Sequence, residues 1–154
     1  MRTLPIYLDS SVIGGYFDAE FEDATGKLWL EMEAGTYRFL SSLLVDQEIA
    51  DAPQRVQDLM AATFNQADLL PITPEVEELA AAYMVQKIVP VRYEDDATHV
   101  AIASVHQIGL LASWNFKHLV NFQRETAFNA VNLLQGYPSI RILSPLELIH
   151  ENDD

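Results

Sequence analysis

The chain has 154 residues, of which 49% are hydrophobic and 21% charged, a composition ordinary for one globular domain with a substantial core. The lack of cysteine excludes disulfides, thiolate zinc sites and cysteine nucleophiles. The 23 acids against 9 Lys plus Arg give a net charge of −14, which disfavours diffuse attraction to nucleic-acid phosphates. The charge indicates a solvated surface, a face for a basic partner, or acids gathered around metal.

The first half of the chain alternates short apolar segments with helical ones. Residues 4–8 form an apolar run that stops at Asp9, which is typical of a buried strand in a parallel sheet. After it we predict, in order, a helix at 12–17, a loop at 18–23, a helix at 24–34, a strand at 37–40, helices at 43–52 and 55–64, and a strand at 69–72.

In the second half, Thr73 caps and Pro74 opens a helix that Pro90 ends. We then predict a loop at 91–94, a helix from Asp95 or Asp96 to 106, a strand at 110–112, an irregular or short-helical segment at 116–124, a helix at 126–135, a strand at 140–143 and a helical turn at 145–149. Alternating strands and helices predict a three-layer α/β/α sandwich with a mainly parallel sheet. We expect one domain over residues 1–150 and a frayed tail at 151–154.

The N-terminal Met-Arg-Thr is followed by too few apolar residues for a signal peptide. No apolar run approaches the length needed to cross a bilayer. We therefore expect a cytoplasmic protein that makes no membrane contact.

Three acids stand out by their position. Asp9 lies at the tip of the first strand, Glu48 on the helix after the second, and Asp96 at the start of the helix before the fourth. If the strands are parallel, all three lie near one edge of the sheet, where open α/β sheets bind ligands. Asn115, at the tip of the fourth strand, adds an uncharged oxygen. Taken alone, either aspartate could cap a helix and Glu48 could be a surface charge.

Carboxylates held close together raise one another's pKa unless a cation neutralises them. Hard oxygen ligands without cysteine suit Mg²⁺ or Mn²⁺, which can activate water and stabilise the transition state of phosphodiester cleavage. Asp95 adjoins Asp96, but neighbours on a helix point about 100° apart, so we favour Asp96. We expect a divalent metal site at this edge of the sheet.

Other polar residues lie close in sequence to these positions. Ser11 could hydrogen-bond a ligand acid or its water, although N-capping is its commoner role. His99 could reach the site from one helical turn beyond Asp96, although such a histidine is more often packed and hydrogen-bonded. Lys117 and His118 could hold substrate phosphate, and the ordinary alternative is a solvated pair.

Four short segments share a familiar order and spacing over nearly the whole chain. They are Tyr-Leu-Asp-Ser-Ser-Val-Ile at 7–13, Ser-Ser-Leu-Leu-Val-Asp-Gln-Glu-Ile at 41–49, Asp-Ala-Thr-His-Val-Ala-Ile-Ala at 96–103 and Ser-Trp-Asn-Phe-Lys-His-Leu-Val-Asn at 113–121. Together they resemble the PIN-domain family, metal-dependent ribonucleases that include the VapC-like toxins of toxin–antitoxin pairs.

The resemblance implies that Asp9, Glu48 and Asp96 form the family's acidic site for Mg²⁺ or Mn²⁺. It places Asn115 where many members carry a fourth acid, so we expect one tight ion and a second brought in by substrate phosphate. It also implies a metal-dependent endoribonuclease that cleaves RNA as the toxin of a type II pair. An antitoxin partner and a homodimer follow from the same resemblance.

Two other functions remain open at this point. The first is a catalytically weak or inactive PIN-like module whose acidic surface binds a basic protein. The second is a phosphomonoesterase that uses the same acids on small phosphate esters. Metal dependence and the choice of substrate separate these three functions.

Overall fold

The computed structural model describes residues 2–150. Its sheet contains five strands, β1 (Leu4–Leu8), β2 (Tyr37–Ser42), β3 (Leu69–Leu70), β4 (Leu110–Ala112) and β5 (Arg141–Leu143). The strands lie in the order β3-β2-β1-β4-β5, and every neighbouring pair is parallel. The predicted parallel sheet is therefore confirmed, and it is wholly parallel.

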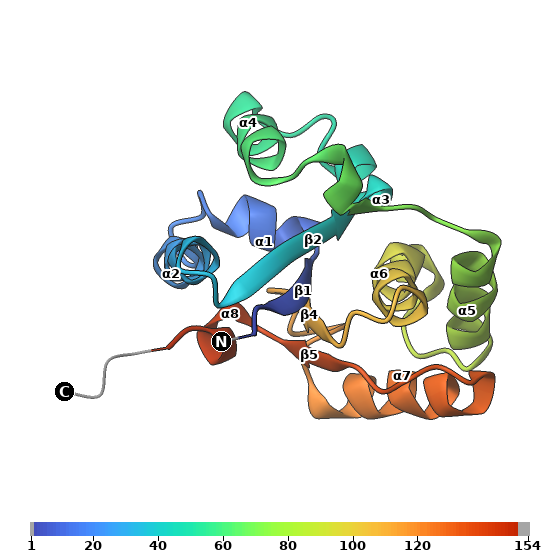
Figure 1. Ribbon diagram of the computed structural model, residues 1–154. Coiled ribbons are helices and arrows are strands. Elements are labelled where there is room, and N and C mark those ends of the chain that lie inside the picture. Colours follow the sequence, from blue (N-terminus) through green and yellow to red (C-terminus); the bar gives the residue numbers. More distant parts are fainter. Residues whose placement is uncertain (1, 151–154) are drawn as a thin grey trace.

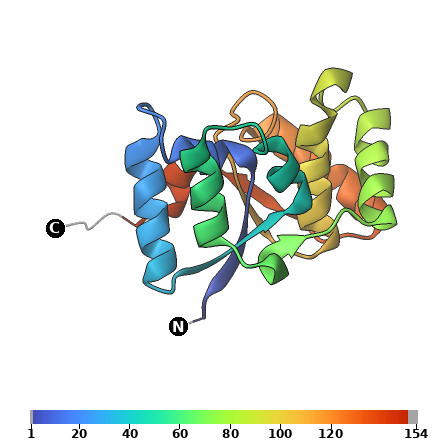
Figure 2. The same ribbon diagram turned by 90° about the horizontal axis from the view of Figure 1, so that it is seen from above.

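Helices connect the strands and cover both faces of the sheet. They are α1 (Ser10–Gly15), α2 (Glu22–Glu33), α3 (Leu43–Glu48), α4 (Gln54–Thr63), α5 (Pro74–Val85), α6 (Glu94–Val105), α7 (Phe122–Gln135) and α8 (Pro145–Leu148), with short 3-10 turns η1 (Gln66–Asp68) and η2 (Val91–Tyr93). Figures 1 and 2 show α2 on one side of the strands and α5 and α6 on the other. The predicted three-layer α/β/α architecture is thus confirmed.

The chain reverses direction across the sheet between β1 and β4. It moves outward from β1 through β2 to β3, then crosses back to β4 and continues to β5. Because parallel crossovers are right-handed, the connecting helices of the two halves cover opposite faces. The carboxyl ends of β1 and β4 flank this reversal, and open α/β sheets bind ligands in the crevice at such a point.

The strand β1 is central and buried on both faces. Ile6, Tyr7 and Leu8 are each 0% exposed. A strand covered by helices on both sides carries a continuous apolar run instead of alternating with polar residues. The apolar run that predicted this strand is therefore explained by the burial of β1 on both faces.

Several element boundaries differ from those predicted. Helix α3 ends at Glu48, short of the predicted end at 52, and α1 begins at Ser10. The segment 116–124, predicted to be irregular or short-helical, contains the start of α7, which begins at Phe122 and not at the predicted residue 126. Asn121 makes this start possible because its Oδ1 accepts a hydrogen bond from the Arg124 N–H at 2.9 Å, which caps the helix.

Two predictions concern the extent of the chain. The frayed tail predicted at 151–154 lies outside the described residues, and one domain over 1–150 stays a prediction. Within residues 2–150, every helix is too short or too polar to span a bilayer.

Gly15 lets α1 pack closely against the Trp114 indole, and a larger residue would disturb this contact. A Cβ at Gly15 would lie 2.7 Å from the Trp114 Nε1. That indole cannot shift freely, because it stacks on Phe21 at 4.2 Å between centroids and donates to the Thr25 Oγ1 at 3.0 Å. We expect Gly15→Ala to lower the free energy of unfolding by about 1 to 3 kcal/mol.

Urea denaturation monitored by circular dichroism measures this effect. Gly14→Ala is the matched control, because a Cβ at Gly14 would meet nothing within 4 Å. Alanine is a better helix former than glycine, so the control should gain about 0.5 to 1 kcal/mol. Equal effects of the two substitutions would contradict the role of the close approach.

Candidate functional site

Asp9 lies directly after β1 at the switch point of the sheet. Its side chain is buried, and Asp9 is the N-cap of α1 because its Oδ1 accepts from the Val12 N–H at 3.2 Å. The Ser11 hydroxyl donates to the same oxygen at 2.6 Å, and the Ser113 hydroxyl donates to Oδ2 at 2.6 Å. The Asp9 carboxylate therefore caps α1 and also takes part in the polar contacts of the site.

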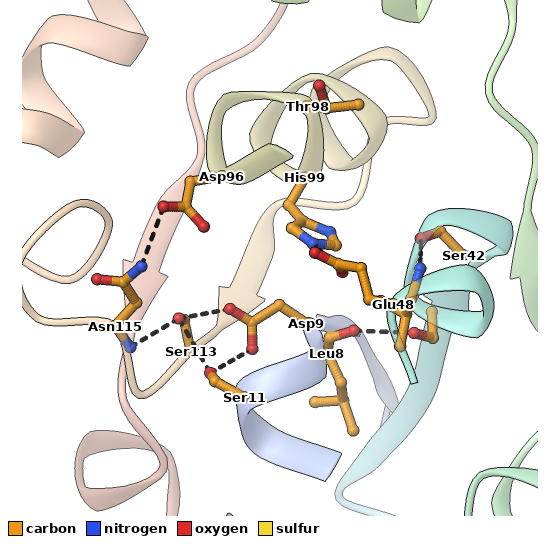
Figure 3. A network of polar contacts seen from close by, with 12 residues as sticks. Leu8, Asp9, Ser11, Ser42, Glu48, Asp96, Thr98, His99, Ser113 and Asn115 are labelled. Atoms are coloured by element: carbon orange, nitrogen blue, oxygen red, sulfur yellow. Dashed lines mark hydrogen bonds and ion pairs between the residues drawn. The ribbon is translucent and has the colours of Figure 1, made fainter. Parts of the chain in front are cut away.

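The two serines connect Asp9 to the loop that follows β4. The Trp114 N–H donates to the Ser11 Oγ at 2.8 Å, and the Asn115 N–H donates to the Ser113 Oγ at 2.9 Å. Each hydroxyl thus accepts from the loop backbone and donates to Asp9 (Figure 3). The β4 loop and the carboxylate hold each other in place.

Glu48 is the last residue of α3 and is bound by a histidine of α6. The Glu48 Oε1 lies 2.7 Å from the His99 Nε2. The other ring nitrogen, His99 Nδ1, lies 2.6 Å from the Tyr7 hydroxyl of β1. The His99 side chain is 2% exposed, whereas that of Glu48 is 24% exposed, so the carboxylate stands between the core and solvent.

Asp96 lies in the first turn of α6 and is bound by the β4 loop. Its Oδ2 accepts from the Asn115 Nδ2 at 3.2 Å and lies 3.1 Å from the His118 Nδ1. The Asn115 Oδ1 in turn accepts from the His118 N–H at 2.9 Å. Asn115 therefore presents its amide nitrogen to Asp96 and uses its oxygen to order the loop.

The three acids converge from three elements. Figure 3 shows Asp9 entering from the end of β1, Glu48 from α3 and Asp96 from α6. His99 lies close enough to all three for their negative charges to act on its pKa. The structure thus brings together the residues that the sequence placed at one edge of the sheet.

Burial dominates the ionisation of this region. It raises the pKa of the Asp9 carboxyl, although the positive charge of His99 and the serine hydrogen bonds oppose it. Burial also raises the pKa of Asp96 against the hydrogen bond to His118. For His99, burial lowers the pKa, but the Glu48 hydrogen bond and the surrounding acids outweigh it and raise the pKa. A nearby cation would favour the ionised carboxylates.

Lys117 and His118 are placed very differently. Lys117 is exposed in the loop after β4, two residues after Asn115. The His118 side chain is 4% exposed, binds Asp96 and packs against the Tyr93 ring at 4.2 Å between centroids. Its Nε2 is buried and has no hydrogen-bonding partner among the described residues. Of the two, only Lys117 has a side chain that solvent or a phosphate reaches freely in this conformation.

The carboxylates do not form a closed metal cage. Among residues 2–150, no group of three or more His, Cys, Asp or Glu side chains is arranged to hold a metal ion. In the same part of the chain, the Asp96 Oδ1 and the Glu48 Oε2 accept no hydrogen bond from protein. These open oxygens suit Mg²⁺, which usually keeps several waters and takes one or two protein carboxylates.

Three residues of the site were not predicted to belong to it. Ser113 binds Asp9, Tyr7 binds His99, and Ser42 lies 2.8 Å from the Tyr7 hydroxyl. Ser113 and Ser42 each lie at the end of a strand that reaches the carboxyl edge, and this position is the signal that could have identified them. Tyr7 falls within an apolar run, where a hydroxyl gives no sign of its partner.

The arrangement of the strands and helices defines the fold. A wholly parallel sheet of five strands, with helices on both faces and acids at its carboxyl edge, is a three-layer α/β/α fold of the PIN-like kind. The crystal structure of FitAcB from Neisseria gonorrhoeae is similar, with a TM-score of 0.58 and 14% sequence identity over 92% of this chain and 98% of that chain. No protein-family model and no curated protein sequence matches the chain. The likeness therefore shows the fold alone.

Proposed function

We propose that the protein is a metal-dependent endoribonuclease that hydrolyses RNA phosphodiester bonds. The observation that carries the proposal is the convergence of Asp9, Glu48 and Asp96 at the switch point of the sheet. The open oxygens of Asp96 and Glu48 support Mg²⁺ or Mn²⁺ as the cofactor. The four segments that resemble PIN-domain ribonucleases supply the reaction class.

Each site residue has a distinct part in this proposal. When bound, the cation supplies an activated water and offsets the charge that develops on the phosphate. Asp96 and Glu48 would offer their open oxygens to the cation, Asp9 would join them directly or through one of the waters that the ion keeps, and Ser11 orients Asp9 through its 2.6 Å hydrogen bond.

Two residues of the β4 loop complete the proposed site. Asn115 orients Asp96 through its amide nitrogen at 3.2 Å. Exposed Lys117, two residues after Asn115, supplies a positive charge to substrate phosphate in a protein whose net charge is −14. His118, which the sequence suggested as a phosphate-binding residue, is buried and instead positions Asp96 from the buried side of the loop.

The biological setting is part of the same proposal. We infer a cytoplasmic toxin of a type II pair that is bound by an antitoxin protein and forms a homodimer. Size-exclusion chromatography with light scattering tests the dimer, and a monomer at micromolar concentration would contradict it.

RNA cleavage in Mn²⁺ and in EDTA tests the reaction class. We expect cleavage at internal phosphodiester bonds of single-stranded RNA in Mn²⁺ and no cleavage in EDTA. A small phosphate ester in the same buffer tests the phosphomonoesterase alternative. Hydrolysis of the ester without RNA cleavage would favour that alternative, and RNA cleavage in EDTA would contradict metal dependence.

Thermal unfolding with and without Mn²⁺ separates the enzyme from a metal-free binding module. We expect Mn²⁺ at 100 times its Kd to stabilise the protein by about 2.7 kcal/mol, because the ion binds the folded state. Ca²⁺ and Na⁺ at matched ionic strength are the controls. An unchanged melting temperature would favour the inactive protein-binding module.

A further inference from the structure

A buried chain of hydrogen bonds ends on Glu48, and we propose that its histidine, His99, is the positioning residue that holds this carboxylate for metal binding. The inference rests on the proposed function and concerns the same site. Two members of this chain of hydrogen bonds, Tyr7 and Ser42, are buried in the core. Figure 3 shows His99 above Glu48, with Ser42 on the far side.

The contacts are short and continuous. Ser42 Oγ lies 2.8 Å from the Tyr7 hydroxyl, which lies 2.6 Å from the His99 Nδ1, and the His99 Nε2 lies 2.7 Å from the Glu48 Oε1. Three distances within ordinary hydrogen-bond range leave no gap in the chain. The four side chains therefore act on one another in sequence.

The Glu48 end of this chain of hydrogen bonds determines which ring nitrogen of His99 donates to the carboxylate. At one end the Val45 N–H, which can only donate, donates to Ser42 Oγ at 3.1 Å. At the other end, ionised Glu48 can only accept. The His99 Nε2 therefore carries a proton and donates it to Glu48 whether the ring is neutral or protonated, while the Tyr7 hydroxyl joins the His99 Nδ1 to Ser42 Oγ.

Burial makes this chain rigid up to its last member. Tyr7 and Ser42 are 0% exposed and the His99 side chain is 2% exposed, whereas the Glu48 side chain is 24% exposed. An unpaired glutamate at a helix end keeps several rotamers, and ordering it costs conformational entropy. The His99 donor restricts those rotamers before a cation arrives, as outer partners do for metal-binding carboxylates.

These hydrogen bonds also fix the position of Glu48 relative to the other two acids. Tyr7 stands two residues before Asp9 on β1, and His99 stands one helical turn after Asp96 on α6. Ser42 caps the start of α3, and Glu48 ends that helix. The connection therefore ties both ends of the short α3 to the two elements that carry the remaining acids.

Mn²⁺ affinity, measured by isothermal titration calorimetry, tests the positioning role. We expect His99→Asn, whose amide reaches only toward Tyr7, to raise the Kd about 10- to 100-fold. His99→Gln, whose longer amide can donate to Glu48, should restore affinity to within about 5-fold of the wild type. Tyr7→Phe removes only a hydroxyl and should raise the Kd by about 10-fold.

His106→Asn, at the end of the same helix, is the matched control and should bind Mn²⁺ like the wild type. Circular dichroism establishes that each variant is folded. Wild-type affinity in folded His99→Asn and Tyr7→Phe would overturn the positioning role while leaving the nuclease proposal intact.

Nitrogen-15 NMR of the metal-free protein tests the chain without any cation. We expect a protonated Nε2 on His99 whose proton resonance lies far downfield, and Glu48→Gln should move that resonance upfield. An unprotonated Nε2, or a resonance that ignores Glu48→Gln, would overturn the proposal. If the wild type binds no Mn²⁺, the proposed function fails, and these spectra still decide whether His99 holds Glu48.

Discussion

Asp9→Asn is expected to reduce Mn²⁺-dependent RNA cleavage by more than about 100-fold. Losing an outer partner of a metal-binding residue costs up to about 100-fold, and Asp9 is itself proposed to bind the metal. The amide has nearly the shape of the carboxylate, so the Ser11 and Ser113 hydroxyls remain able to pack around it. It lacks the negative charge that would hold a cation, and it presents an N–H₂ group where Asp9 accepts from Ser113 at 2.6 Å. The loss of activity should therefore come from weaker cation binding and not from a disordered site.

The folded state without metal should tolerate Asp9→Asn well. Burial raises the pKa of the Asp9 carboxyl, so at neutral pH the ionised form is less favourable in the folded than in the unfolded protein. This penalty grows as the pH rises from the unfolded-state pKa through the folded-state pKa. The neutral amide removes it, and we expect an equal or higher melting temperature at pH 7 in EDTA.

Gel assays of RNA cleavage and thermal scans on the same preparations measure the two effects together. Asp46→Asn is the matched control, because Asp46 is an exposed acid on α3, the helix that also carries Glu48. The control should cleave like the wild type. Cleavage by folded Asp9→Asn within about 10-fold of wild-type rates would contradict the assigned role.

The framework of the site could be predicted because its signals are local. An apolar run that ends at Asp9 indicates a buried parallel strand, and such strands end at the ligand-binding edge. Glu48 and Asp96 follow from the same reasoning, since each lies on a helix next to that edge. Local patterns thus placed the three acids near one another without knowledge of their contacts.

The contacts themselves depend on residues far apart in the chain. Tyr7 and His99 are separated by 92 positions, and Asp9 and Ser113 by 104. Whether two such hydroxyls and ring nitrogens meet depends on strand register, for example the pairing of Tyr7 with Leu111 across β1 and β4. Periodicity does not encode register between strands that lie so far apart, so the network around the acids was not predictable.

Asn132→Leu is expected to lower the free energy of unfolding by about 3 kcal/mol, because it removes the centre of a buried polar network. Asn132 is 0% exposed; its Oδ1 accepts from the Tyr83 hydroxyl, and its Nδ2 donates to the Ser104 Oγ at 2.9 Å and the Pro138 carbonyl at 3.2 Å. These partners join α5, α6 and α7 on one face of the sheet. Leucine keeps the volume but removes these bonds, so the buried Tyr83 and Ser104 hydroxyls keep only their 3.4 Å contact with each other, and the Pro138 carbonyl loses the Asn132 donor.

For a chain of this length, the loss corresponds to a melting temperature lower by about 6 to 12 °C. Leu133→Ala is the control at the next position, where the side chain is 80% exposed, and should change stability by less than about 0.5 kcal/mol. Tyr83→Phe removes one partner of the same network, so the double variant should lose less than the sum of the two single losses. Additive losses, or a loss below about 1 kcal/mol in Asn132→Leu, would mean that the three helices are held by apolar packing and not through this amide.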